Sequence, residues 1–161
     1  MTPKKYSFLT TWRLRAPLKD VWNLLIDGEH WPEWWTGVLT VTTIRPGGPN
    51  RVGLTTDQVW KSALPYKLRM RIEIIKVDEP ALIEVSSQGA LQGVGIMRFS
   101  TSGDITQVQY TWDVETTEWW MNLLAPFLTG LFRWNHAYIM NAGARCLARR
   151  LNAQLISTIS S

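Results

Sequence analysis

The sequence predicts an α+β domain in which a curved antiparallel sheet of seven strands closes with one long C-terminal helix around an apolar cavity. Two short helices are expected after the first strand. Residues 6–15 alternate apolar and polar side chains, which is typical of a half-buried strand. Six further strand-like segments follow between 37 and 115, and the short turns between them favour antiparallel neighbours. From about 119 the alternation stops and the composition favours a helix.

The N-terminal quarter predicts one strand and two short helices. In the strand 6–15, Phe8 and Trp12 share one face with Thr10 and Leu14, whereas charged Arg13 and Arg15 lie on the other. Pro17 suits the first turn of a helix over 17–27, and Gly28 ends that helix. Pro32 suits the start of another helical turn or two within 30–35.

The middle of the chain predicts a meander of six strands, at 38–44, 52–61, 66–77, 81–89, 93–100 and 106–115. The segments between them, 46–50, 64–65, 78–80 and 102–104, are rich in the Pro, Gly, Asp and Asn of turns. Alternation is clearest over 66–77, where apolar residues such as Met70 and Ile72 oppose charged ones such as Arg69 and Arg71. One face of the sheet is therefore expected to be wet and the other buried.

The long helix is expected to cover the sheet with one apolar stripe. Counting 100° per residue from Phe132, the stripe contains His136, Ile139, Met140, Gly143, Leu147 and Leu151. Residues 157–161 are expected to be frayed. The chain shows no repeat, linker or low-complexity tract, so we expect a single domain over 1–161.

Composition excludes several function classes. The net charge is +4, but the basic residues are scattered, so no nucleic-acid partner is expected. Cys146 is the only cysteine, which excludes an internal disulfide and favours the cytoplasm. No signal-peptide core or membrane-spanning segment is found. His30 and His136 lack further ligands at recognisable spacing, so neither a metal nor any other cofactor is expected.

Several motifs resemble one known superfamily. The order of elements resembles that of the START-like superfamily, also called SRPBCC, whose helix-grip fold surrounds an internal cavity. The run from Ala16-Pro17 through Val21-Trp22 to Trp31-Pro32 and Trp34 is similar to the N-terminal signature of its polyketide cyclase/dehydratase branch. Segments 121–126 and 132–136 also resemble bacterial members. The resemblance implies a cavity for a hydrophobic ligand, and it leaves the chemistry open because the superfamily contains carriers, receptors and cyclases.

The residues expected to bind that ligand come from the apolar faces of the strands and of the long helix. They are Trp12, Trp60, Met70, Met97, Tyr110, Trp112, Phe132, His136 and Met140. His136 is the titratable group near the middle of the helical stripe, where an imidazole could orient or protonate a ligand carbonyl. It is the candidate catalytic residue. The alternative for each of these side chains is that it only fills the core.

Three functions stay open at this point. The leading hypothesis is binding, for transport or sensing, of a lipid-like, aromatic or polycyclic molecule. The rival is a cyclase/dehydratase-type enzyme that folds a reactive polyketone, with His136 moving protons. A protein-interaction module would instead expose the rings at 31, 34 and 35, or at 119 and 120. Segment 119–128 is interpreted as a lid over the pocket; packing in a homodimer stays open, and stable membrane insertion is not expected.

Overall fold

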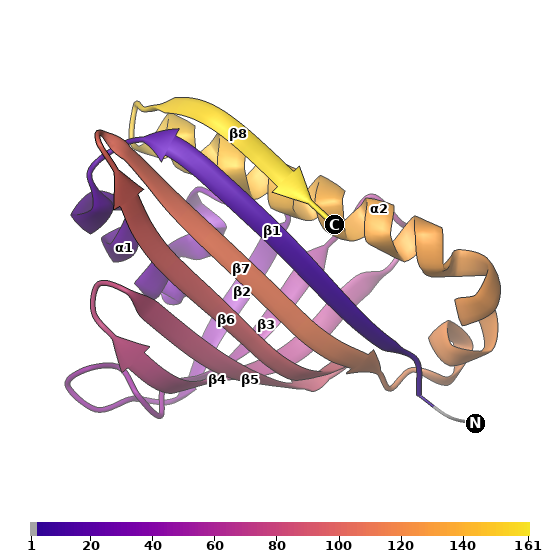
Figure 1. The fold of residues 1–161 in the computed structure, drawn as a ribbon. Helices are drawn as coiled ribbons and strands as arrows, with labels where there is room; N and C mark the ends of the chain where they lie inside the picture. Colours follow the sequence, from indigo (N-terminus) through magenta and orange to yellow (C-terminus); the bar gives the residue numbers. More distant parts are fainter. Residues whose placement is uncertain (1–2) are drawn as a thin grey trace.

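The computed structural model describes residues 3–161 and contains the helix-grip arrangement (Figure 1). The elements are β1 (Lys5–Arg15), α1 (Leu18–Ile26), the 3₁₀ helix η1 (Gly28–Glu33), β2 (Val38–Arg45), β3 (Thr55–Lys61), β4 (Lys67–Asp78), β5 (Leu82–Gly89), β6 (Leu91–Ser102), β7 (Ile105–Thr116), α2 (Trp119–Arg150) and β8 (Gln154–Ser160). The predicted α+β class, with short helices after the first strand and a long helix near the C-terminus, is confirmed.

All eight strands form one antiparallel sheet in the order β2-β3-β4-β5-β6-β7-β1-β8. The sheet curves around α2, which crosses its concave side (Figure 1). Strand β1 pairs with β7 in a register that places Phe8 opposite Trp112 and Thr10 opposite Tyr110. Because directly opposed side chains point to the same face of a sheet, the alternation of β1 and β7 brings these rings to the inner face.

Strand β8 is an element that the sequence analysis did not predict, and the expectation of a frayed end at 157–161 is wrong. After α2, Asn152 adopts a left-handed conformation with φ 51°, as asparagine often does just beyond a helix. The chain then reverses and pairs with β1 from Arg15↔Gln154 to Thr10↔Ser160. Thr158 Oγ1 also donates a hydrogen bond of 2.8 Å to Asn141 Oδ1 on α2. The sheet therefore has eight strands rather than seven.

Helix α2 buries most of the predicted stripe against the sheet. Phe132, Ile139, Met140, Gly143 and Leu147 are buried. Pro126 lies inside the helix, and the first turns run at an angle to the rest in Figure 1. A proline removes one backbone hydrogen bond and clashes with the preceding turn, which accounts for the bend.

Two apolar clusters support the sheet. The larger one joins α1, η1 and the second half of α2 to the inner face and contains Trp12, Trp22, Trp34 and Trp35. The smaller one lies beneath the first half of α2 and contains Tyr6, Phe8, Trp112, Met121 and Phe132. Within residues 3–161, no helix is long and apolar enough to cross a membrane.

Candidate functional site

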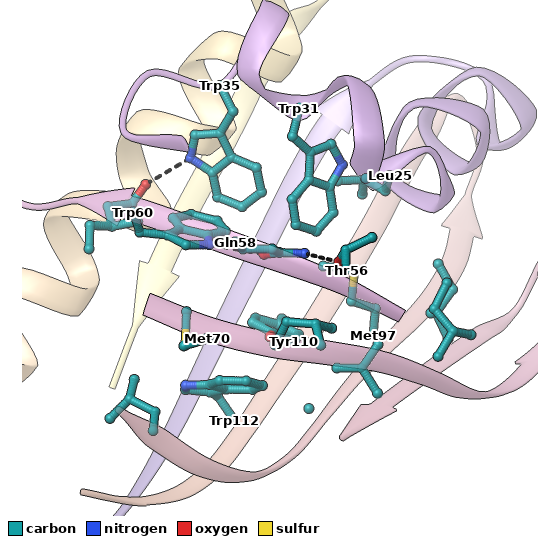
Figure 2. Close-up of a pocket in the computed structure, with 18 of the residues that line it drawn as sticks. Leu25, Trp31, Trp35, Thr56, Gln58, Trp60, Met70, Met97, Tyr110 and Trp112 are labelled. Atoms are coloured by element: carbon teal, nitrogen blue, oxygen red, sulfur yellow. Dashed lines mark hydrogen bonds between the residues drawn. The ribbon is translucent and has the colours of Figure 1, made fainter. Parts of the chain in front are cut away.

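An internal cavity of about 130 Å³ lies between the inner face of the sheet, the segment from α1 to η1 and helix α2. Figure 2 shows the rings of Trp31 and Trp35 reaching in from the helical side, with Tyr110 and Trp112 on the sheet. The rest of the wall is formed mainly by aliphatic side chains of β4, β5 and β6. Such an apolar wall with a few polar groups is typical of a small-molecule site.

Seven of the nine side chains expected to bind a ligand lie on the cavity wall. They are Trp60, Met70, Met97, Tyr110, Trp112, His136 and Met140. They come from β3, β4, β6, β7 and α2, so the fold brings together residues that are distant in the sequence. Whether each contacts a ligand stays a prediction.

Trp12 and Phe132 are buried but do not line the cavity. Trp12 points to the inner face as expected, yet the ring of Trp35 packs edge-on against it at 5.5 Å between centroids and separates it from the cavity. Phe132 points to the sheet as expected, but it packs against Tyr6 at 6.0 Å in the smaller cluster. The periodic patterns give the correct face for both rings and cannot show what covers that face.

Trp31 and Trp35 are cavity residues that the sequence analysis considered only as surface candidates. Trp35 is 2% exposed and contacts four other indoles, those of Trp12, Trp31, Trp34 and Trp60, with centroids 5.1–5.7 Å away. Its Nε1 donates a hydrogen bond of 3.3 Å to the carbonyl oxygen of Ile139 on α2. The three tryptophans within 31–35 could have indicated this cluster. The cluster connects η1 to the long helix.

A chain of polar side chains on β3 was also missed. The indole Nε1 of Trp60 donates to Gln58 Oε1 at 2.9 Å, and Gln58 Nε2 donates to Thr56 Oγ1 at 3.1 Å (Figure 2). All three residues alternate onto the inner face, are buried and line the cavity. Buried amides and hydroxyls need partners, and this chain supplies them. Alternation with apolar neighbours could have assigned Gln58 and Thr56 to the wall.

Tyr110 and His136 present the remaining polar groups of the wall. The Tyr110 hydroxyl lies over Gly95, where a methyl group would approach it within 2.9 Å. Burial raises the pKa of Tyr110, so its hydroxyl stays protonated. Burial, helped by the Arg133 charge, lowers the pKa of His136 to about 4. The imidazole is therefore neutral near pH 7, and it stacks on Phe8 with centroids 4.2 Å apart.

Among the described residues that line the cavity, Glu29 is the one with a carboxylate. Both oxygens of this carboxylate already accept hydrogen bonds. Its Oε2 accepts a hydrogen bond of 2.7 Å from the guanidinium of Arg51, and its Oε1 accepts one of 3.0 Å from Thr43. Arg51 also reaches Asp27 at 3.4 Å, and its backbone has φ 70°. The ion pairs connect η1 to the loop between β2 and β3 at the edge of the cavity.

Other charged candidates lie outside the cavity. Asp57 points outward and forms an ion pair of 2.7 Å with Arg71. That pairing lowers the pKa of Asp57. His30 is exposed and pairs with Asp27 at 2.9 Å, which raises the pKa of His30. Within residues 3–161 no three His, Cys, Asp or Glu side chains gather as metal ligands.

Comparison with family models assigns most of the chain to one group. Residues 7–154 match the model described as "Polyketide cyclase / dehydrase and lipid transport". No curated protein matches the sequence.

Solved structures share the fold at low sequence identity. The protein TTHA0849 from Thermus thermophilus superposes with a TM-score of 0.73 at 20% identity, over 90% of this chain and 99% of that one. The Zhui aromatase/cyclase from Streptomyces sp. R1128 gives 0.68 at 16% identity, over 91% and 96%. A START superfamily protein from Mycobacterium smegmatis gives 0.69 at 14% identity, over 91% and 98%. Similarity at these identities establishes the shared fold.

Proposed function

The chain belongs to the polyketide cyclase/dehydrase and lipid transport family, and from this premise we propose that it binds a hydrophobic small molecule in its internal cavity. The observation that carries the proposal is the cavity itself, with four indoles and three methionines on its wall. Aromatic and thioether groups make favourable contacts with ring compounds. We propose that this binding serves transport or sensing in the cytoplasm.

The volume of the cavity limits the ligand. An apolar cavity of about 150 Å³ is known to hold a benzene molecule, and this one measures about 130 Å³. A cavity of this volume therefore suits a single ring with small substituents. A lipid-like or polycyclic ligand requires a larger cavity than this one.

A cyclase/dehydratase-type enzyme is the alternative, and the electrostatics of the wall make it less favoured. A general base works best when its pKa is close to the working pH, whereas the pKa of His136 is about 4. Tyr110 with a raised pKa is a weak acid. These two groups are better suited to orienting a ligand by hydrogen bonds than to moving protons at neutral pH.

Native mass spectrometry, followed by extraction and identification of any bound molecule, tests the binding proposal. We expect a reproducible hydrophobic adduct on the purified protein. Val85→Phe places extra volume on the cavity wall and should remove the adduct, whereas Val94→Phe at an exposed position should retain it. Absence of any adduct, together with no binding across a panel of lipids and aromatic compounds, would contradict the proposal.

A second function, self-association, is favoured by the exposed apolar face of α2. Phe127 is 85% exposed, Trp119 71% and Trp134 55%, and the same face includes Leu123, Leu124, Leu131 and Tyr138. From these fractions and typical side-chain areas the face offers roughly 800 Å². This exceeds the largest apolar patch of an ordinary monomer and is close to the area that each partner contributes to a standard interface. We infer that a second copy of the chain covers it.

Light scattering coupled to size-exclusion chromatography tests the self-association. The wild-type protein should elute with the mass of a dimer, and Phe127→Ser combined with Trp134→Ser should yield a monomer. Ile44→Ser, which removes an exposed apolar side chain from β2, is the control and should leave the mass unchanged. A wild-type protein that is monomeric at 100 µM would overturn this inference.

A further inference from the structure

We propose that the cavity selects neutral ring compounds that carry a hydrogen-bond acceptor, such as an aryl ketone, over carboxylates of the same shape. The inference rests on the proposed binding function and specifies the ligand class for that site. It follows from three features of the wall: a free hydroxyl donor, an amide whose orientation is set by a neighbouring indole, and the lack of a cation among the lining residues.

The free donor is the hydroxyl of Tyr110. The ring extends from the middle of β7, stacks beside Trp112 at 5.8 Å and presents its hydroxyl above Gly95. None of the side-chain hydrogen bonds found within residues 3–161 involves this hydroxyl, and Tyr110 lies on the cavity wall. A hydroxyl that faces an apolar cavity without a protein partner lacks hydrogen bonds that it would make in bulk water. A ligand oxygen that accepts this proton removes the cost.

The amide of Gln58 is oriented by Trp60. An indole N–H can only donate, so the amide oxygen must face Trp60 at 2.9 Å. The NH₂ group consequently points the other way and donates one proton to Thr56 Oγ1 at 3.1 Å. Its second proton and the hydroxyl proton of Thr56 are left for the cavity. The β3 wall therefore also offers donors, which favours a ligand with acceptor oxygens.

The charge of the wall disfavours an anionic ligand. Glu29 is the charged residue of the lining, its carboxylate is held by Arg51 at 2.7 Å, and no lysine or arginine is among the residues that line the cavity. The guanidinium carbon of Arg133 lies 5.6 Å from the centroid of the Phe8 ring, and Arg133 is not among the lining residues. A buried carboxylate without a facing cation is costly. A ketone offers an acceptor oxygen without that cost.

Three probes of similar shape test the proposal: acetophenone, ethylbenzene and benzoate. Each is titrated at pH 7.5 into wild-type protein, Tyr110→Phe and Tyr138→Phe, and the indole N–H signals of the tryptophans are followed by NMR. Tyr138 lies on the exposed apolar face of α2 and not on the cavity wall, and phenylalanine keeps its apolar ring, so its variant controls for loss of a hydroxyl away from the cavity. Line shapes and melting temperatures show whether each variant is folded.

We expect Tyr110→Phe to weaken acetophenone binding about three- to tenfold, the effect of losing one hydrogen bond. Ethylbenzene should change less than twofold, Tyr138→Phe should bind both as the wild type does, and benzoate should bind the wild type at least tenfold more weakly than acetophenone. Equal losses for ketone and hydrocarbon, no loss for either, or benzoate binding as tight as acetophenone would overturn the selectivity while leaving the binding function intact. If no probe shifts any indole signal, the selectivity proposal fails, whereas the binding function fails only if the purified protein also carries no adduct and binds no member of the lipid and aromatic panel.

Discussion

The contact between α2 and Trp35 offers the sharpest test of how this fold is held together. A methyl group added at Gly143 would lie 2.5 Å from Trp35 Cζ2 and 2.7 Å from Trp35 Nε1. The ring cannot move aside freely, because four other tryptophans surround it. Gly143→Ala must therefore displace either the helix or the five-indole cluster by roughly 1 Å, and overpacking of this kind costs about 1–3 kcal/mol.

Gly130 is the matched control on the same helix. Nothing lies within 4 Å of the position that its Cβ would take, so Gly130→Ala should yield only the gain in helix propensity, up to about 1 kcal/mol. Both variants share this gain, and their difference isolates the packing cost. For a chain of this size, 1–3 kcal/mol corresponds to a gap of about 2–12 °C between the two melting temperatures.

Circular dichroism at 222 nm during thermal unfolding measures the gap, with urea unfolding as a second estimate. Gly143→Ala should melt below the wild type or level with it, and Gly130→Ala should melt above it. If Gly143→Ala is as stable as Gly130→Ala, then the close approach of Trp35 to α2 does not constrain the helix and the reasoning is refuted.

Three further outcomes are expected. Trp112→Ala should lower the free energy of unfolding by about 3–5 kcal/mol in urea titrations, whereas Trp134→Ala, at an exposed position, should lower it by less than about 1 kcal/mol. The pKa of His136 is about 4 in the folded protein and 6.5 ordinarily, so the unfolded chain binds a proton that the folded chain does not. The free energy of unfolding should therefore fall as the pH drops below 6.5, by about 2 kcal/mol at pH 5. The free energy of unfolding of His136→Gln should fall by about 2 kcal/mol less over this range, and identical pH profiles would contradict the burial of His136. Gly95→Ala would bring a methyl within 2.6 Å of the Trp112 ring and displace that ring on the cavity wall. Native mass spectrometry should then show loss of the adduct. An adduct that is retained would contradict the position assigned to the Trp112 ring.

The strands and helices were predictable because most of them carry their own local pattern. Alternation assigned Trp112 and Tyr110 on β7, and Met70 on β4, to the face that contains the cavity. Helical spacing likewise directed His136 and Met140 inward. The direction of each of these side chains follows from the periodicity of its strand or helix, which the local sequence indicates.

The remaining features depend on residues far apart in the chain. Trp12 is separated from the cavity by Trp35, and Trp35 can reach its place only because Gly143 leaves space on α2. The inner stripe of α2 is longer than the cavity, so Phe132 meets Tyr6 instead of a ligand. Strand β8 lacks clear alternation and forms because β1 offers an edge for pairing. Tertiary contacts of this kind override local propensity.

The position of β1 between β7 and β8 has a consequence for the kinetics of folding. On the ribosome β1 is made first, yet Thr10 pairs with Tyr110 on one side and Ser160 on the other. Topologies dominated by such distant pairings have high contact order and fold slowly. Until β7 has been made, the alternating apolar residues of β1 therefore have no strand to pair with. We expect β1 to be the segment of the nascent chain that most needs protection from aggregation.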